Sequence, residues 1–149
     1  MAARYLLDTN LLVYTLDRRV PEKRERAVEV VRRAGRSGGA ALPAQVLAEF
    51  SSACLRKLEP RPEAEAVRAE VDRLLIAFPV LPLTGAVVLE AVRGVRDHTL
   101  SYYDAQIWAA ARLGQVGAVL SEDFNPGATL DGVAFINPLD PDFDLADLD

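Results

Sequence analysis

Four acidic residues, Asp8, Glu49, Asp104 and Asp123, stand where an acid is costly unless something binds it. Asp8 directly follows the apolar run at 5–7, and Asp123 closely follows another apolar run. Carboxylates that converge repel one another and take up protons unless a cation joins them. Mg²⁺ accepts such oxygen ligands while keeping several waters. Two divalent ions about 3.5–4 Å apart can activate a water and stabilise the leaving oxygen in phosphodiester cleavage.

The other two acids lie on predicted helices rather than after strands. Glu49 stands between Val46 and Ala53, at the border of an apolar stripe. Asp104 precedes Ile107 by three residues, so both side chains share one helix face. Acids on apolar faces are rare unless they are paired or bind a metal. The spacing therefore makes both residues candidate metal ligands.

Each acid also has a simpler interpretation. Asp8, or either of the next two residues, could cap the following helix, and the spacing of Ser101 and Asp104 matches a capping box. Asp123 could be a turn residue, and Glu49 could pair with an arginine. The joint arrangement favours a metal site, because no matching set of buried cations is visible in the sequence.

The elements that must position these acids follow from hydrophobic periodicity. Strands are expected at 5–7, 40–42, 118–120 and 133–136, with an edge strand in the proline-rich segment 79–83. Helices are expected just after Asp8, from Pro21, at 46–58, at 64–78, from Thr84 and at 101–114. The helix from Thr84 is expected to place Val88, Ala91, Val92 and Val95 inward. This alternation predicts an α/β fold, a three-layer α/β/α sandwich with a mainly parallel central sheet. In such sheets ligands gather at the carboxyl ends of strands, where Asp8 and Asp123 are expected.

Length and composition predict one domain over residues 1–149, with a frayed acidic tail from about residue 139. Half of the residues are hydrophobic and 26% are charged, which is ordinary for a globular protein. The single cysteine, Cys54, cannot form an internal disulfide, which fits a reducing cytoplasm. We see neither a secretion signal nor an apolar run of 18 residues, so no membrane association is expected.

Charge is unevenly distributed along the chain. The net charge of −5 argues against tight non-specific binding of nucleic acid. Residues 1–36 nevertheless carry nine Lys or Arg against five acids, a local excess of +4. The first cations of this segment after residue 10 are Arg18, Arg19, Lys23 and Arg24. They could contact phosphates or a partner, or they could form a solvated helix face.

Four stretches occur in this order: LLDTNLLVY, PAQVLAEF, LSYYDAQIWAAA and VLSEDFNPG. Together they resemble the PIN-domain family, and most closely the VapC-type toxin ribonucleases of bacterial and archaeal toxin–antitoxin pairs. The resemblance extends from about residue 5 to residue 138, so it covers nearly the whole chain. Each stretch is loose alone, but their order, spacing and chain length make the combination specific.

The resemblance implies metal-binding and catalytic roles for Asp8, Glu49, Asp104 and Asp123, and supporting polar roles for Thr9, Asn10 and Ser121. It implies an endoribonuclease dependent on one or two Mg²⁺ or Mn²⁺ ions, usually a homodimer. It also implies a cognate antitoxin whose C-terminal segment enters the active-site groove. From its charge, the basic segment at residues 18–36 is expected to contact RNA phosphate or this antitoxin. Glu122 could also face a metal, although the Ser-x-Asp pattern favours Asp123.

Other functions fit less well. A DxD-type phosphatase needs a second acid where Asn10 stands, and the lone histidine, His98, precludes a two-histidine ribonuclease. Trp108 lies on an alanine-rich helix and is expected in the core rather than under a stacked base. The remaining alternative is a PIN domain that binds RNA or regulates without cleaving it.

Overall fold

A six-stranded sheet forms the centre of the computed structural model, which describes residues 2–149. Its strands are β1 (Tyr5–Leu7), β2 (Ala40–Pro43), β3 (Val80–Leu81), β4 (Ala118–Leu120), β5 (Thr129–Leu130) and β6 (Val133–Ile136). Their order is β3-β2-β1-β4-β6-β5, and every pairing is parallel except that of β5 with β6. The mainly parallel sheet confirms the predicted fold class.

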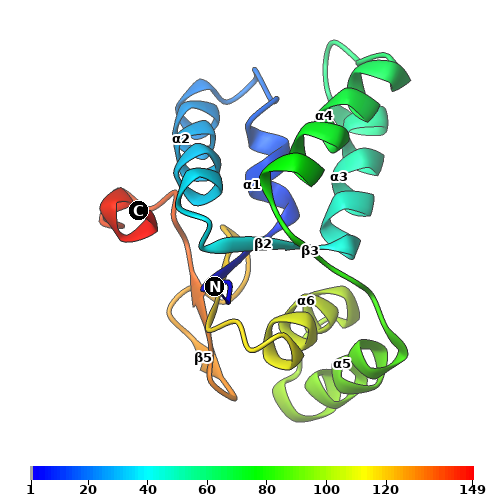
Figure 1. The fold of residues 1–149 in the computed structure, drawn as a ribbon, viewed down its shortest axis with the longest axis vertical. Helices are drawn as coiled ribbons and strands as arrows, with labels where there is room; N and C mark the ends of the chain where they lie inside the picture. The colour runs from blue at the N-terminus through cyan, green and yellow to red at the C-terminus, as the bar shows by residue number, and fades with distance from the viewer. Residues whose placement is uncertain (1) are drawn as a thin grey trace.

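Helices cover both faces of this sheet. They are α1 (Thr9–Tyr14), α2 (Pro21–Ser37), α3 (Ala44–Lys57), α4 (Ala64–Ala77), α5 (Gly85–His98), α6 (Tyr102–Leu113) and the 3₁₀ turn η1 (Leu145–Leu148). Figure 1 shows α2, α3 and α4 on one side of β2 and β3, and α5 and α6 on the other. Among residues 2–149, none of the helices combines the length and apolar character that a membrane span requires.

The central strands are apolar throughout because helices cover them on both faces. In β1, Leu6 and Leu7 are fully buried, and β4 is equally buried at Val119 and Leu120. Burial of both faces explains why these strands appear in the sequence as short continuous apolar runs. It also leaves polar side chains only at the strand ends, where the candidate acids stand.

The short strand β5 was not expected from the sequence. It joins β6 through Asp131 and Gly132, whose φ angles are 48° and 83°. Two consecutive positive φ values match the tight hairpin turn that an Asp-Gly pair favours. That dipeptide is the local signal that could have revealed the hairpin.

The acidic tail lies against α2, which differs from the fraying expected after about residue 139. The Arg26 guanidinium donates to the backbone carbonyls of Pro138, Asp140 and Phe143, at 2.9, 3.1 and 2.7 Å. Leu148 in η1 is fully buried. Apolar residues spaced between the aspartates give this segment a surface to pack, so it is held despite its charge.

Helix α5 faces the core with a different set of residues from the expected one. Val87, Ala91 and Gly94 are buried, while Val88, Val92 and Val95 are partly or largely exposed. Of the residues predicted to face inward, only Ala91 does so. The small residues face α6 because a bulky ring, that of Trp108, occupies the space between the two helices. An apolar face of α5 therefore remains uncovered.

Candidate active site

The carboxyl ends of β1 and β4 are neighbours, and they bring Asp8 beside Ser121. Leu7 pairs with Leu120 in the parallel register, so the next residue of each strand projects at the same edge. The Ser121 hydroxyl donates to Asp8 Oδ2 at 2.7 Å. Asp8 Oδ1 accepts from the Thr9 backbone N–H at 2.7 Å, so Asp8 is also the N-cap of α1. The capping interpretation and the site interpretation thus describe the same side chain.

Asp8 lies in an environment that disfavours its charge. Burial raises the pKa of Asp8 to about 6, although the hydrogen bonds from Ser121 and Thr9 act in the opposite direction. The negative charges of Asp104 and Glu49 contribute smaller parts of this rise in pKa. Asp8 is only 8% exposed and has no cationic partner among residues 2–149. The charges of Glu49 and Asp104 are therefore close enough to affect Asp8, so three of the four candidate acids lie near the end of β1.

Glu49 projects from α3 and is held at both oxygens. The Thr9 hydroxyl donates to Oε2 at 2.8 Å, and Gln45 Nε2 donates to Oε1 at 2.6 Å. Within residues 2–149 its carboxylate forms no ion pair, so the predicted alternative of an arginine partner is not what the structure shows. Thr9 thereby links the start of α1 to the acid on α3.

Asp104 is half-buried in the first turn of α6. The Ser101 side chain makes no capping hydrogen bond, so the predicted capping box does not form. Over the described range, 2–149, the Asp104 carboxylate accepts no side-chain hydrogen bond and pairs with no cation. Its oxygens remain available, which suits a metal ligand better than a helix cap.

Asp123 lies at the exposed side of the same cluster. Asn10 Nδ2 donates to Ser121 Oγ at 3.2 Å and to Asp123 Oδ2 at 3.3 Å. The Asp123 backbone N–H donates to Ser121 Oγ at 3.2 Å, which is the contact expected of a Ser-x-Asp turn. The polar residues Thr9, Asn10 and Ser121 thus contact Glu49, Asp123 and Asp8 respectively.

Glu122 is turned to a different set of partners. Its carboxylate accepts from the Tyr14 hydroxyl at 2.7 Å and lies 2.8 Å from Lys23 Nζ. Lys23 also lies over the Tyr14 ring, 5.1 Å from its centroid. This three-residue contact ties the loop after β4 to α1 and α2. Glu122 is thereby occupied in a way that Asp123 is not.

The oxygen atoms of the four candidate acids are the ligand type that a hard cation prefers, although the four carboxylates do not surround a single point. Among residues 2–149, no three Asp, Glu, His or Cys side chains are close enough to enclose an ion. Mg²⁺, however, commonly uses only one or two carboxylates and completes its shell with water. Asp8, with its raised pKa and without a cation, and Asp104, with free oxygens, fit that requirement. Glu49 and Asp123 stand nearby with hydrogen-bonded carboxylates.

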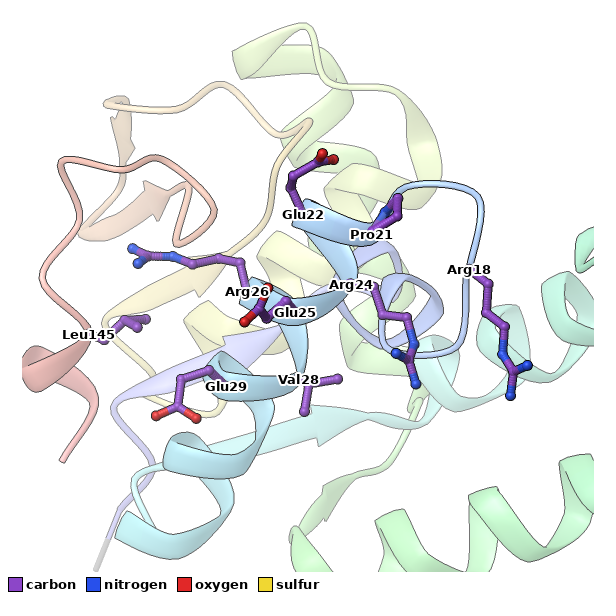
Figure 2. A pocket seen from close by; sticks show the side chains of 9 residues that line it. All are labelled: Arg18, Pro21, Glu22, Arg24, Glu25, Arg26, Val28, Glu29 and Leu145. Carbon is purple, nitrogen blue, oxygen red and sulfur yellow. The ribbon is translucent and has the colours of Figure 1, made fainter.

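The four candidate basic residues divide into two pairs. Arg19 forms hydrogen bonds with both oxygens of Asp17, at 2.9 and 3.1 Å, and Lys23 is bound to Glu122. Arg18 and Arg24 are exposed and form no ion pair within residues 2–149. Figure 2 shows these two side chains extending to the same side of an open hollow of about 1000 Å³ along α2. Only this second pair is available to a phosphate or a partner.

Two buried amides next to the acids were not identified from the sequence. Gln45 on α3 and Gln106 on α6 are 9% and 4% exposed. They donate and accept in a hydrogen-bonded series that ends at Glu49. The available signal was an amide within an apolar helical stripe, at a spacing of four from Glu49.

Comparison with known proteins gives one family and one fold. The family model for the PIN domain matches residues 5–127. A toxin–antitoxin complex from Klebsiella pneumoniae is 18% identical, with a TM-score of 0.63 over 90% of this chain and 97% of that one. VapC20 from Mycobacterium tuberculosis, a sarcin–ricin loop cleaving toxin, is 19% identical, with a TM-score of 0.64 over 85% and 97%. A Pyrobaculum aerophilum protein is 19% identical, with a TM-score of 0.66 over 99% and 90%. No curated protein sequence matches the chain.

Proposed function

Because the chain belongs to the PIN-domain family, we propose that it is a metal-dependent endoribonuclease acting as the toxin of a cytoplasmic toxin–antitoxin pair. The observation that carries this proposal is Asp8, buried at the end of β1 under the charges of Glu49 and Asp104. Structural relatives support it, since one belongs to a toxin–antitoxin complex and another is named as a cleaving toxin.

Each residue of the site has a separate role in this proposal. Asp8 and Asp104 would hold Mg²⁺ or Mn²⁺, and Glu49 and Asp123 would be the further acids of the site. The chemistry that such an ion would supply when bound is activation of a water and stabilisation of the leaving oxygen of the phosphodiester. The remaining polar contacts keep the carboxylates in place: Ser121 on Asp8, Thr9 on Glu49 and Asn10 on Asp123.

The test of this function is RNA cleavage with and without a divalent ion. Wild-type protein should cleave structured RNA in Mg²⁺ or Mn²⁺ and lose activity in excess chelator. Asp104→Asn should lose more activity than the roughly 10–100-fold that changes around metal ligands produce, because a ligand itself is removed. Asp72→Asn is the matched control, since Asp72 is exposed on α4 and should leave cleavage unchanged.

Cleavage that persists in excess chelator would rule out metal dependence. Metal-insensitive RNA binding without cleavage would support the other candidate, a PIN domain that binds or regulates. We expect instead that Asp104→Asn still binds RNA, because it keeps the basic residues, but that it no longer cleaves RNA, because it lacks one metal ligand.

A groove of this protein between α2 and α4 offers a surface on which the antitoxin could bind. The groove has a volume of about 630 Å³ and an apolar floor that includes Val31, Phe50 and Phe78. The lining arginines are Arg24, Arg32, Arg36 and Arg73. A segment with apolar residues along one side and acids along the other would complement it. Within residues 2–149, Arg18, Arg24 and Arg36 are exposed and form no ion pair, so these cations are available to RNA phosphate or to the antitoxin.

The uncovered face of α5 supports a homodimer. Leu89 and Val92 are 76% and 55% exposed, and Leu113 of α6 lies beside them. We expect wild-type protein to be a dimer by light scattering at micromolar concentration. Val92→Glu should give a monomer, because a charge buried in an apolar interface is costly.

Ile76→Glu is the matched control for dimerisation. Ile76 is 82% exposed on α4, so the same change there introduces the same charge away from α5. A monomeric wild type, or dissociation by both variants alike, would contradict a dimer through α5.

A further inference from the structure

We propose that Gln45 is a positioning residue that orients the Glu49 carboxylate and fixes its place relative to Asp104. This inference rests on the proposed function, in which both acids serve a metal site. Gln45 lies one helical turn before Glu49 on α3, and its amide also reaches the first turn of α6. It is a buried side chain that connects the two helices from which these acids project.

A continuous series of hydrogen bonds leads from the surface to Glu49. The Tyr102 hydroxyl donates to Gln106 Oε1 at 2.8 Å. Gln106 Nε2 donates to Gln45 Oε1 at 2.7 Å. Gln45 Nε2 then donates both to Glu49 Oε1, at 2.6 Å, and to the Tyr103 backbone carbonyl, at 3.0 Å. Every amide atom of Gln45 is therefore engaged.

The direction of this series is determined by the Tyr103 carbonyl. A backbone carbonyl can only accept a hydrogen bond, so the Gln45 atom facing it must be the amide nitrogen. That nitrogen faces Glu49 as well, and it presents an N–H whatever the state of the carboxyl group. The Gln45 oxygen must then accept from Gln106. The amide orientation follows from the chemistry of its partners and leaves one arrangement.

A purely structural role would not require these residue types. Gln45 and Gln106 are buried, and they line one small cavity together with apolar residues that include Leu81, Val87 and Ala110. A buried amide costs free energy unless its hydrogen bonds are complete, and an apolar pair would fill the same volume without that demand. A role in positioning explains the two amides, because the series of hydrogen bonds ends where Gln45 contacts Glu49, an acid of the site.

The hydrogen bond from Gln45 to the Tyr103 carbonyl also explains how Gln45 affects the position of Asp104. Asp104 is the next residue along α6, so a shift of that first turn would move both together. Gln45 is bound to this turn and to Glu49 at once, and it therefore sets the relative position of acids on two different helices. Hydrogen-bond partners of metal-ligating carboxylates commonly change metal affinity or activity by roughly 10–100-fold when removed.

The experiment replaces both amides, so that neither is left unpaired. In Gln45→Leu with Gln106→Leu, we expect the dissociation constant for Mn²⁺, measured by electron paramagnetic resonance of the free ion, to rise roughly 10–100-fold. The melting temperature in chelator should stay close to that of wild type. RNA cleavage at saturating Mn²⁺ should also fall, because Glu49 is no longer held in its orientation. If the double variant does not fold, Gln45→Met alone replaces it, with the same expected loss of Mn²⁺ affinity.

A second pair of measurements separates positioning from packing. If Gln45 acts through Glu49, adding the two leucines to Glu49→Gln should weaken Mn²⁺ binding no further, since coupled residues are non-additive. An equal loss in both backgrounds, or an unchanged Mn²⁺ affinity in the folded variant, would overturn the positioning role alone. A wild-type protein that neither binds Mn²⁺ nor cleaves RNA would overturn the proposed function and, with it, this inference.

Discussion

Replacing Asp8 by Asn should raise the free energy of unfolding of the metal-free protein, by up to about 3 kcal/mol at pH 7. The reason is that burial raises the pKa of Asp8 from 3.8 to about 6, so the charged form is held in the fold at a cost. Asn keeps an oxygen acceptor for the Thr9 N–H and removes the charge. In a domain of this size, each kcal/mol corresponds to roughly 2–4 °C in melting temperature.

The pH dependence has a defined sign. Because the folded-state pKa lies above the unfolded value of 3.8, Asp8 favours folding when it is protonated. That contribution is fully present below about pH 4 and is lost as the pH rises through about 6. Wild type and Asp8→Asn should therefore have similar stabilities at pH 4 and diverge by pH 7, as measured by urea melts in chelator.

The exposed acid Asp72 provides the comparison, since Asp72→Asn should change stability by no more than about 0.5 kcal/mol at any of these pH values. Mn²⁺ should reverse the order of wild type and Asp8→Asn, because an ion that binds only the folded site stabilises it. Equal stabilities of the two proteins at pH 7 in chelator would show that Asp8 carries no electrostatic strain.

The sequence indicated the central strands because they are buried on both faces and therefore apolar throughout. It did not indicate β5, which has two residues, one of them exposed. On α5, the valines at helical spacing were expected in the core. An apolar stripe that packs against the core and an apolar stripe that stays exposed have the same helical periodicity, so the sequence does not distinguish them. The position of Trp108 between α5 and α6 decided which stripe was buried.

The candidate acids could be named from their types, their spacing and a family resemblance. Their contacts could not, because they depend on which elements meet. Glu122 is bound by Tyr14 and Lys23, which come from α1 and α2, whereas the neighbouring Asp123 is bound by Asn10. The same holds for Gln45, because an amide on an apolar helical stripe indicates a specific contact only when its partner on α6 is known.

Gly94→Ala should lower the free energy of unfolding by roughly 1–3 kcal/mol, the usual cost of inserting an extra carbon into a packed core. A Cβ at Gly94 would lie 2.8 Å from the Trp108 ring. That ring is fully buried and held by its N–H, which donates to the Leu130 carbonyl at 3.1 Å. The Arg93 guanidinium lies over it, 5.2 Å from the ring centroid. The ring therefore cannot withdraw without breaking these contacts.

Gly85→Ala makes the same chemical change with the opposite expected sign. Gly85 begins α5, and a Cβ there would have nothing within 4 Å. Helix propensity favours Ala over Gly by up to about 1 kcal/mol, so this variant should be stabilised where Gly94→Ala is destabilised. Urea denaturation of the three proteins in one buffer measures both differences. If Gly94→Ala is as stable as Gly85→Ala, then α5 and α6 are not packed tightly enough for Trp108 to fix their separation. In that case the packing of α5 against α6 would not hold the exposed apolar face of α5 and the first turn of α6, which carries Asp104, in fixed positions.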